Sequence, residues 1–136
     1  MPGGTCGAGA IRKSPLPAPR DFALDGRQAG RAVFRAMLSH VVIFWTKPEL
    51  PGAADALIAG AEQYLRPIPL AQSFHIGRMV PSHRDVVDQS YQVGLHLLFA
   101  SKAAEEAYQV HPLHLEFVEK AFKPNCARAT IFDFAP

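Results

Sequence analysis

The sequence contains only two cysteines, Cys6 and Cys126, which cannot supply a framework of disulfide bonds. We therefore expect both thiols to be reduced and the protein to be cytoplasmic. No apolar run is long enough to span a membrane, and no apolar stretch of signal-peptide length follows a basic start. The sequence thus predicts a protein with no membrane partner.

Motifs for phosphate binding and for serine nucleophiles are also missing. Gly3, Gly4 and Gly7 lack the strand-turn-helix context of a phosphate loop, and no serine stands in a nucleophile elbow. The net charge of +2 comes from residues 1–36, which carry six basic and two acidic side chains, whereas residues 37–136 carry eight and ten. A mildly acidic folded part argues against nucleic acid as a partner.

Residues 1–36 differ in composition from the rest of the chain. Pro15, Pro17 and Pro19 alternate, glycines cluster near the start, and apolar residues are scattered. We expect a flexible N-terminal extension here and one folded domain over residues 37–136. An alternative is that Met37 is the natural start and the residues before it are an upstream extension.

The folded part alternates between the residue patterns of strands and of helices. Strands are expected where β-branched, aromatic and alternating apolar residues gather, and helices where apolar residues repeat every three to four positions. The expected order is strand 39–45, helix 53–65, strand 72–80, strand 90–99, helix 102–109, helix 112–122 and strand 127–134. This β-α-β-β-α-β order predicts an α+β fold of the ferredoxin-like type.

The two faces of the predicted sheet are both apolar. The strand over 90–99 should turn one face to the helices, through Tyr91, Val93, Leu95, Leu97 and Phe99. The opposite face still carries Val41, Ile43, Trp45, His96 and Leu98. A single domain would expose this second face to water, so we predict a homodimer whose two sheets pack face to face.

A short segment places a phenol and two imidazoles three residues apart, at Tyr108, His111 and His114. Pro112 disfavours a helical residue before it and suits the first position of a helix, so one helix should end near Val110 and another begin at Pro112. His111 then lies at the joint and His114 at the edge of the apolar stripe of the second helix. A titratable ring in that place suits a ligand pocket.

Three stretches together resemble the stress-responsive A/B barrel (Dabb) family. They are Ser39-His40-Val41-Val42-Ile43-Phe44, Ser90-Tyr91-Gln92-Val93, and Tyr108-x-x-His111-Pro112-x-His114-x-x-Phe117-Val118. The resemblance covers residues 37–136. It implies a dimeric α+β barrel with a pocket between sheet and helices in each subunit, and for some members a role in the stress response.

One branch of that family, the plant polyketide cyclases, closes a linear poly-β-ketone by intramolecular aldol condensation. The resemblance places its catalytic tyrosine and histidine at Tyr108 and His114, and its first-strand histidine at His40. The cyclases have another histidine on the third strand, where this chain has Val93. That departure weakens transfer of the cyclase reaction to this protein.

The chemistry of the candidate site leaves several roles open. His114 could take a proton from carbon next to a carbonyl, with Tyr108 donating a hydrogen bond to the oxygen, or both rings could contact a ligand or close the pocket without catalysis. His111 and His114 alone are a weak ligand set, so we expect no metal and no cofactor. The remaining predicted pocket residues are Val42, Phe44, Val93, Leu95 and His111. We expect Cys126 to be buried, and Glu105 and Glu106 to be solvated surface charges.

The preferred interpretation is a small dimeric protein that binds an apolar or aromatic small molecule. In addition to binding, it could catalyse proton transfer or cyclisation of a carbonyl compound. The alternative is a non-enzymatic stress protein whose pocket is filled by its own side chains. The two differ in whether an open cavity touches Tyr108 and His114.

Overall fold

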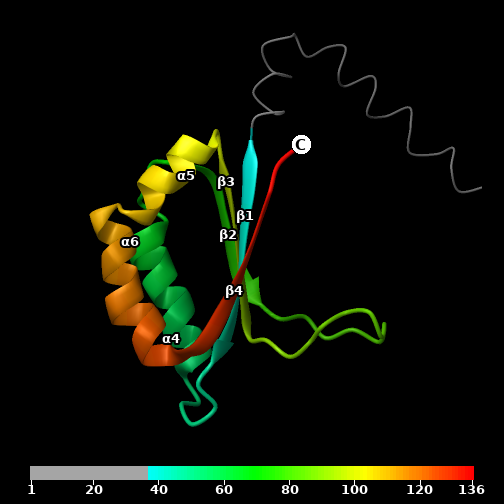
Figure 1. Cartoon of the computed structure of the whole chain (residues 1–136). Coiled ribbons are helices and arrows are strands. Elements are labelled where there is room, and N and C mark those ends of the chain that lie inside the picture. Colours follow the sequence, from blue (N-terminus) through cyan, green and yellow to red (C-terminus); the bar gives the residue numbers. More distant parts are fainter. Residues whose placement is uncertain (1–36) are drawn as a thin grey trace, which may run out of the picture. The chain divides into compact units, whose positions relative to one another are not determined.

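Residues 37–136, the part of the chain described by a computed structural model, form a four-stranded antiparallel sheet with helices on one face (Figure 1). The predicted flexible extension over residues 1–36 lies outside the described residues. The strand order β2-β3-β1-β4 and the element order confirm the ferredoxin-like prediction. The elements are β1 (Leu38–Thr46), α4 (Ala53–Gly60), the π-helical turn η1 (Ala61–Leu65), β2 (Ala71–Arg78), β3 (Val93–Phe99), α5 (Lys102–Gln109), α6 (Pro112–Phe117), the π-helical turn η2 (Val118–Phe122), α7 (Lys123–Asn125) and β4 (Cys126–Phe134).

The third strand starts later than predicted, at Val93 and not at Ser90. The Asp88 carboxylate accepts hydrogen bonds from the backbone N–H and the hydroxyl of Ser90, which holds this stretch in a turn. The prediction that Tyr91 shares the helix-facing side was therefore wrong. Its ring packs edge-on against Trp45, with centroids 6.5 Å apart, beside the face of the sheet without helices.

The helices on either side of Pro112 begin with side-chain caps. The Ser101 hydroxyl accepts a hydrogen bond from Ala104 N at 3.1 Å at the start of α5, and His111 Nδ1 accepts one from Leu113 N at 3.0 Å at the start of α6. Pro112 therefore fixes the bend between α5 and α6.

The core lies between the sheet and the helices. Alternate residues of β1 are buried, and strand register places Val42 beside Leu95 of β3 and Ile131 of β4. The helices approach each other closely at Gly60, where an added Cβ would collide with Ala121. The same register sets His40 opposite Asp133, which brings two polar residues to the helix-facing side of the sheet.

Candidate functional site

A cavity of about 160 Å³ lies between the sheet and the helices. Its walls are apolar except at one end, where four polar residues, His40, Tyr108, Gln109 and His114, border it. Its apolar lining consists of Val42, Phe44, Leu65, Leu95, Phe117, Val118, Phe122, Ala129 and Ile131. A mostly apolar cavity with a few polar groups at one end is typical of a small-molecule site.

The structure brings together most, but not all, of the residues predicted for the pocket. Val93 is fully buried in the core and does not line the cavity. His111 also lies outside the lining, because its ring is used to cap α6. Of the four apolar residues predicted for the pocket, three line the cavity: Val42, Phe44 and Leu95.

Tyr108 and His114 meet at the polar end of the cavity, with ring centroids 4.8 Å apart and planes at 59°. Tyr108 belongs to the last turn of α5 and His114 to the first turn of α6, so the bend at Pro112 sets their approach. Burial of the Tyr108 ring, and then the negative charge of Glu105, raise the pKa of its hydroxyl. Tyr108 therefore remains a neutral hydrogen-bond donor at neutral pH.

His114 has the properties of a neutral base. Burial lowers its pKa, and the backbone carbonyl of Gln109 opposes that effect without cancelling it. Its Nδ1 atom is buried and has no hydrogen-bond partner within residues 37–136. The imidazole is therefore uncharged at neutral pH and keeps a buried polar atom that the described part of the chain does not satisfy.

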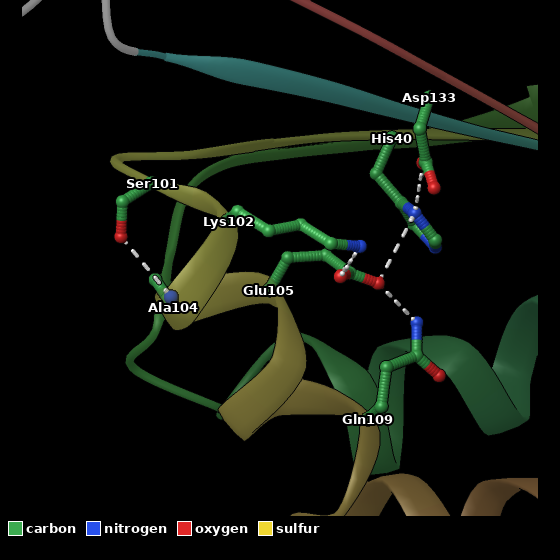
Figure 2. Close-up of polar contacts among 7 residues, drawn as sticks. All are labelled: His40, Ser101, Lys102, Ala104, Glu105, Gln109 and Asp133. Carbon is green, nitrogen blue, oxygen red and sulfur yellow. Dashed lines mark hydrogen bonds and ion pairs between the residues drawn. The ribbon is translucent and has the colours of Figure 1, made fainter.

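His40 also lies beside Tyr108, with ring centroids 6.1 Å apart, and is 3% exposed. Its Nδ1 is 2.6 Å from Asp133 Oδ1 and 3.8 Å from Glu105 Oε2 (Figure 2). Since a carboxylate at neutral pH only accepts hydrogen bonds, Nδ1 carries the proton. Nε2 of a neutral His40 is then the acceptor nitrogen.

Glu105 is buried, with 3% exposure, so the prediction of a solvated surface charge was wrong. Its carboxylate accepts hydrogen bonds from Lys102 Nζ at 3.0 Å and from Gln109 Nε2 at 2.6 Å. Burial alone would raise the pKa of Glu105, but these two hydrogen bonds, together with the charges of Lys102 and His40, outweigh it and the pKa is lowered. The spacing Lys102, Glu105, Gln109 was a helix-face signal that could have suggested this contact. For Asp133, only the strand register identifies the partner.

Among the described residues, His40, Glu105 and Asp133 form the one cluster whose ligand atoms lie close enough to suit a metal ion, all within 4.8 Å. The donor types fit a divalent cation, but the spacing does not. His40 Nδ1 and Asp133 Oδ1 are 2.6 Å apart, whereas two ligands bound to one ion at about 2.1 Å lie about 3 Å apart. The observed distance is that of a hydrogen bond between the His40 ring and the Asp133 carboxylate, not that of two ligands on one metal ion.

Buried Cys126 is a poor nucleophile, because burial raises its pKa to about 11.

No helix in the described part of the chain is both long enough and apolar enough to cross a membrane.

Comparison with known proteins gives a family and a fold. The stress responsive A/B barrel domain model matches residues 38–136. A Dabb family protein with a ferredoxin-like fold from Mesorhizobium loti is 26% identical, with a TM-score of 0.61 over 74% of this chain and 96% of that chain. A dimeric ferredoxin-like protein of unknown function from Thermobifida fusca is 19% identical, with a TM-score of 0.62 over 76% and 94%.

A hydroxynitrile lyase from Passiflora edulis is 18% identical, with a TM-score of 0.64 over 75% of this chain and 94% of that chain. At these identities, the similarity to the T. fusca protein and to the hydroxynitrile lyase concerns the fold alone. A search of the curated proteins finds no match. Because the family model covers every element that the structure describes, from β1 to the end of β4, this chain belongs to the stress-responsive A/B barrel domain (Dabb) family.

Proposed function

We propose that the protein binds a small apolar or aromatic carbonyl compound between its sheet and helices and moves a proton on it. The observation that carries this proposal is the 160 Å³ cavity with Tyr108 and His114 at its polar end. A buried apolar cavity of about 150 Å³ is large enough for one benzene ring. The size therefore favours a one-ring ligand over the long chain that a polyketide cyclase folds.

His114 and Tyr108, at the polar end of the cavity, have different roles in the proposed proton transfer. Neutral His114 takes the proton from carbon next to the ligand carbonyl, and the electron pair of the broken C–H bond moves into the enolate. The Tyr108 hydroxyl donates a hydrogen bond to the oxygen where negative charge develops. Return of the proton at another carbon gives isomerisation, whereas attack of the enolate carbon on a second carbonyl gives cyclisation.

Binding is tested by NMR titration of the full chain with benzaldehyde and with acetylacetone. We expect resonances of Tyr108 and His114 to shift, and the affinity to fall in His114→Ala because the polar end of the cavity loses a ring. The matched control is His83→Ala, since His83 is exposed in the loop between β2 and β3. A spectrum that neither compound perturbs would contradict the proposal and favour a non-enzymatic stress protein.

The second part of the proposal is a homodimer formed through the face of the sheet that carries no helices. That face has a hollow of about 240 Å³ lined by Val41, Ile43, Gly77 and Gly94 among others. On the same face, strand register places Phe132 beside Val41, and Phe132 remains 55% exposed. His75, Arg78 and His96 also line the hollow, but the rest of its lining is apolar, and a mostly apolar open face indicates an interface. The similar T. fusca protein is described as dimeric.

Ile43→Asp is expected to convert the dimer to monomers, because it places an unpaired charge in the middle of the buried interface. Light scattering at micromolar concentration measures the change as a halving of the molar mass. Leu115→Asp is the matched control, since Leu115 is 53% exposed on α6, away from the sheet. A dimer that survives Ile43→Asp would show that another surface holds the copies together.

A further inference from the structure

Glu105 is a buried negative charge beside the polar end of the cavity, and the proposed reaction does not use it. Its side chain is 4% exposed, whereas the Lys102 side chain that pairs with it is 60% exposed. Water therefore screens the positive partner much more than the carboxylate. On the cavity side, Glu105 Oε2 faces His40 and Gln109, two of the four polar residues that border the cavity (Figure 2).

The hydrogen bond from Gln109 to Glu105 decides which end of the Gln109 amide is free. Gln109 Nε2 donates to Glu105 Oε2 at 2.6 Å, and a carboxylate at neutral pH can accept but not donate. The amide is therefore turned with its nitrogen toward Glu105. Gln109 lines the cavity, and its Oε1, which is turned away from Glu105 (Figure 2), can accept a hydrogen bond from a ligand and repels another oxygen acceptor.

Asp133 adds to this polarity from the sheet side. Its carboxylate accepts a hydrogen bond from His40 Nδ1 at 2.6 Å, and its side chain is 34% exposed. Two carboxylates thus flank one histidine next to the cavity, and the ammonium nearest to them lies at the surface. A ligand that brings a third carboxylate to this end meets like charge in partly buried surroundings, where charges interact more strongly than in water.

We propose that Glu105 is a specificity-determining residue, which makes the cavity select neutral ligands with a hydroxyl group and reject carboxylates. The inference rests on the proposed ligand pocket and names the chemical class that it takes. A ligand hydroxyl donates to Gln109 Oε1, while the ring occupies the apolar part of the cavity. A carboxylate of the same size has no proton to donate and is repelled by Glu105.

This selection is compatible with proton transfer inside the pocket. When His114 takes a proton from a neutral ligand, the net charge of the site does not change, because the enolate and the imidazolium form together. Glu105 also favours the imidazolium that forms, because its charge acts to raise the pKa of His114. The same residue can therefore exclude anionic ligands without opposing the reaction.

The test compares benzyl alcohol with benzoate, two probes with the same ring and different polar groups, by NMR titration of the full chain at pH 7. We expect the wild-type protein to bind benzyl alcohol at least about tenfold more tightly than benzoate. Glu105→Gln removes the charge at nearly constant shape and frees the Gln109 amide to turn, so this preference should fall by about tenfold. Glu106→Gln, a neighbouring change at an exposed residue, should leave the preference unchanged.

Lys102→Gln gives a second variant in case Glu105→Gln does not fold. It removes only the exposed positive partner, so the preference for benzyl alcohol should increase. Equal affinities for the two probes in the wild-type protein, or a preference that neither variant changes, would overturn the role of Glu105 while leaving the ligand pocket intact. If neither probe binds but benzaldehyde does, the selectivity is overturned and the ligand pocket stands; if benzaldehyde does not bind either, both are overturned.

Discussion

Replacing His114 by phenylalanine is expected to lower kcat for proton transfer by about 10²- to 10⁴-fold, the usual contribution of a general base. Phenylalanine keeps a flat ring against Tyr108, whose centroid lies 4.8 Å from that of His114, but has no nitrogen to take a proton. The ligand should still bind, because the apolar part of the cavity is unchanged. Steady-state kinetics with a one-ring carbonyl substrate separates a loss in kcat from a change in KM.

The pH dependence of the same reaction follows from the environment of His114. Because burial lowers its pKa below 6.5, the base form is present at neutral pH and the rate should fall only when the pH drops through that lowered value. The unfolded chain takes up this proton at a higher pH than the folded one. Stability from His114 is therefore complete above pH 6.5 and is lost as the pH falls, and His114→Phe should remove this part of the pH dependence.

His40 is the alternative candidate for the general base. Its Nδ1 is held by Asp133, which leaves Nε2 as the acceptor of a neutral ring. If His114→Phe keeps the full rate and His40→Phe loses it, the base is His40 and the assignment to His114 is wrong. His83→Phe, in an exposed loop, is the control for general effects of removing a histidine.

Local patterns in the sequence were sufficient for the fold and for one pair of site residues. Alternation along β1 and β3 predicted which side chains are buried, because strand geometry alone fixes that period. Pro112 and the spacing from Tyr108 to His114 predicted a helix break with two rings near it. Each of these predictions depends on residues that are close in the chain.

The parts that the sequence did not predict depend on contacts between distant residues. Asp133 reaches His40 through strand register across 93 positions, and nothing near either residue indicates it. Glu105 looks like a surface charge because its neighbour Glu106 is one, and only the packing of α5 against the sheet buries it. The two carboxylates beside the polar end of the cavity were therefore missed, although three of the four polar residues that line it, His40, Tyr108 and His114, were predicted.

Phe44→Ala is expected to lower the free energy of unfolding by about 3–5 kcal/mol, the usual cost of removing a buried phenylalanine ring. Phe44 is 2% exposed, and its ring centroid lies 6.4 Å from that of Phe117 and 6.0 Å from that of Phe122. Chemical denaturation measures the loss. Leu115→Ala, at a 53% exposed position, should cost less than about 1 kcal/mol and serves as the control.

The same variant tests whether the wall of the cavity limits the size of the ligand. Phe44 lines the cavity, so its truncation adds the volume of a ring to the space beside Phe117 and Phe122. A two-ring compound such as 2-naphthaldehyde should then bind the variant and not the wild-type protein. At a hundred times its Kd it would restore about 2.7 kcal/mol of stability. If the variant loses stability but gains no affinity for the larger ring, the helices have collapsed into the space, and Phe44 supports the core without setting the size of the ligand.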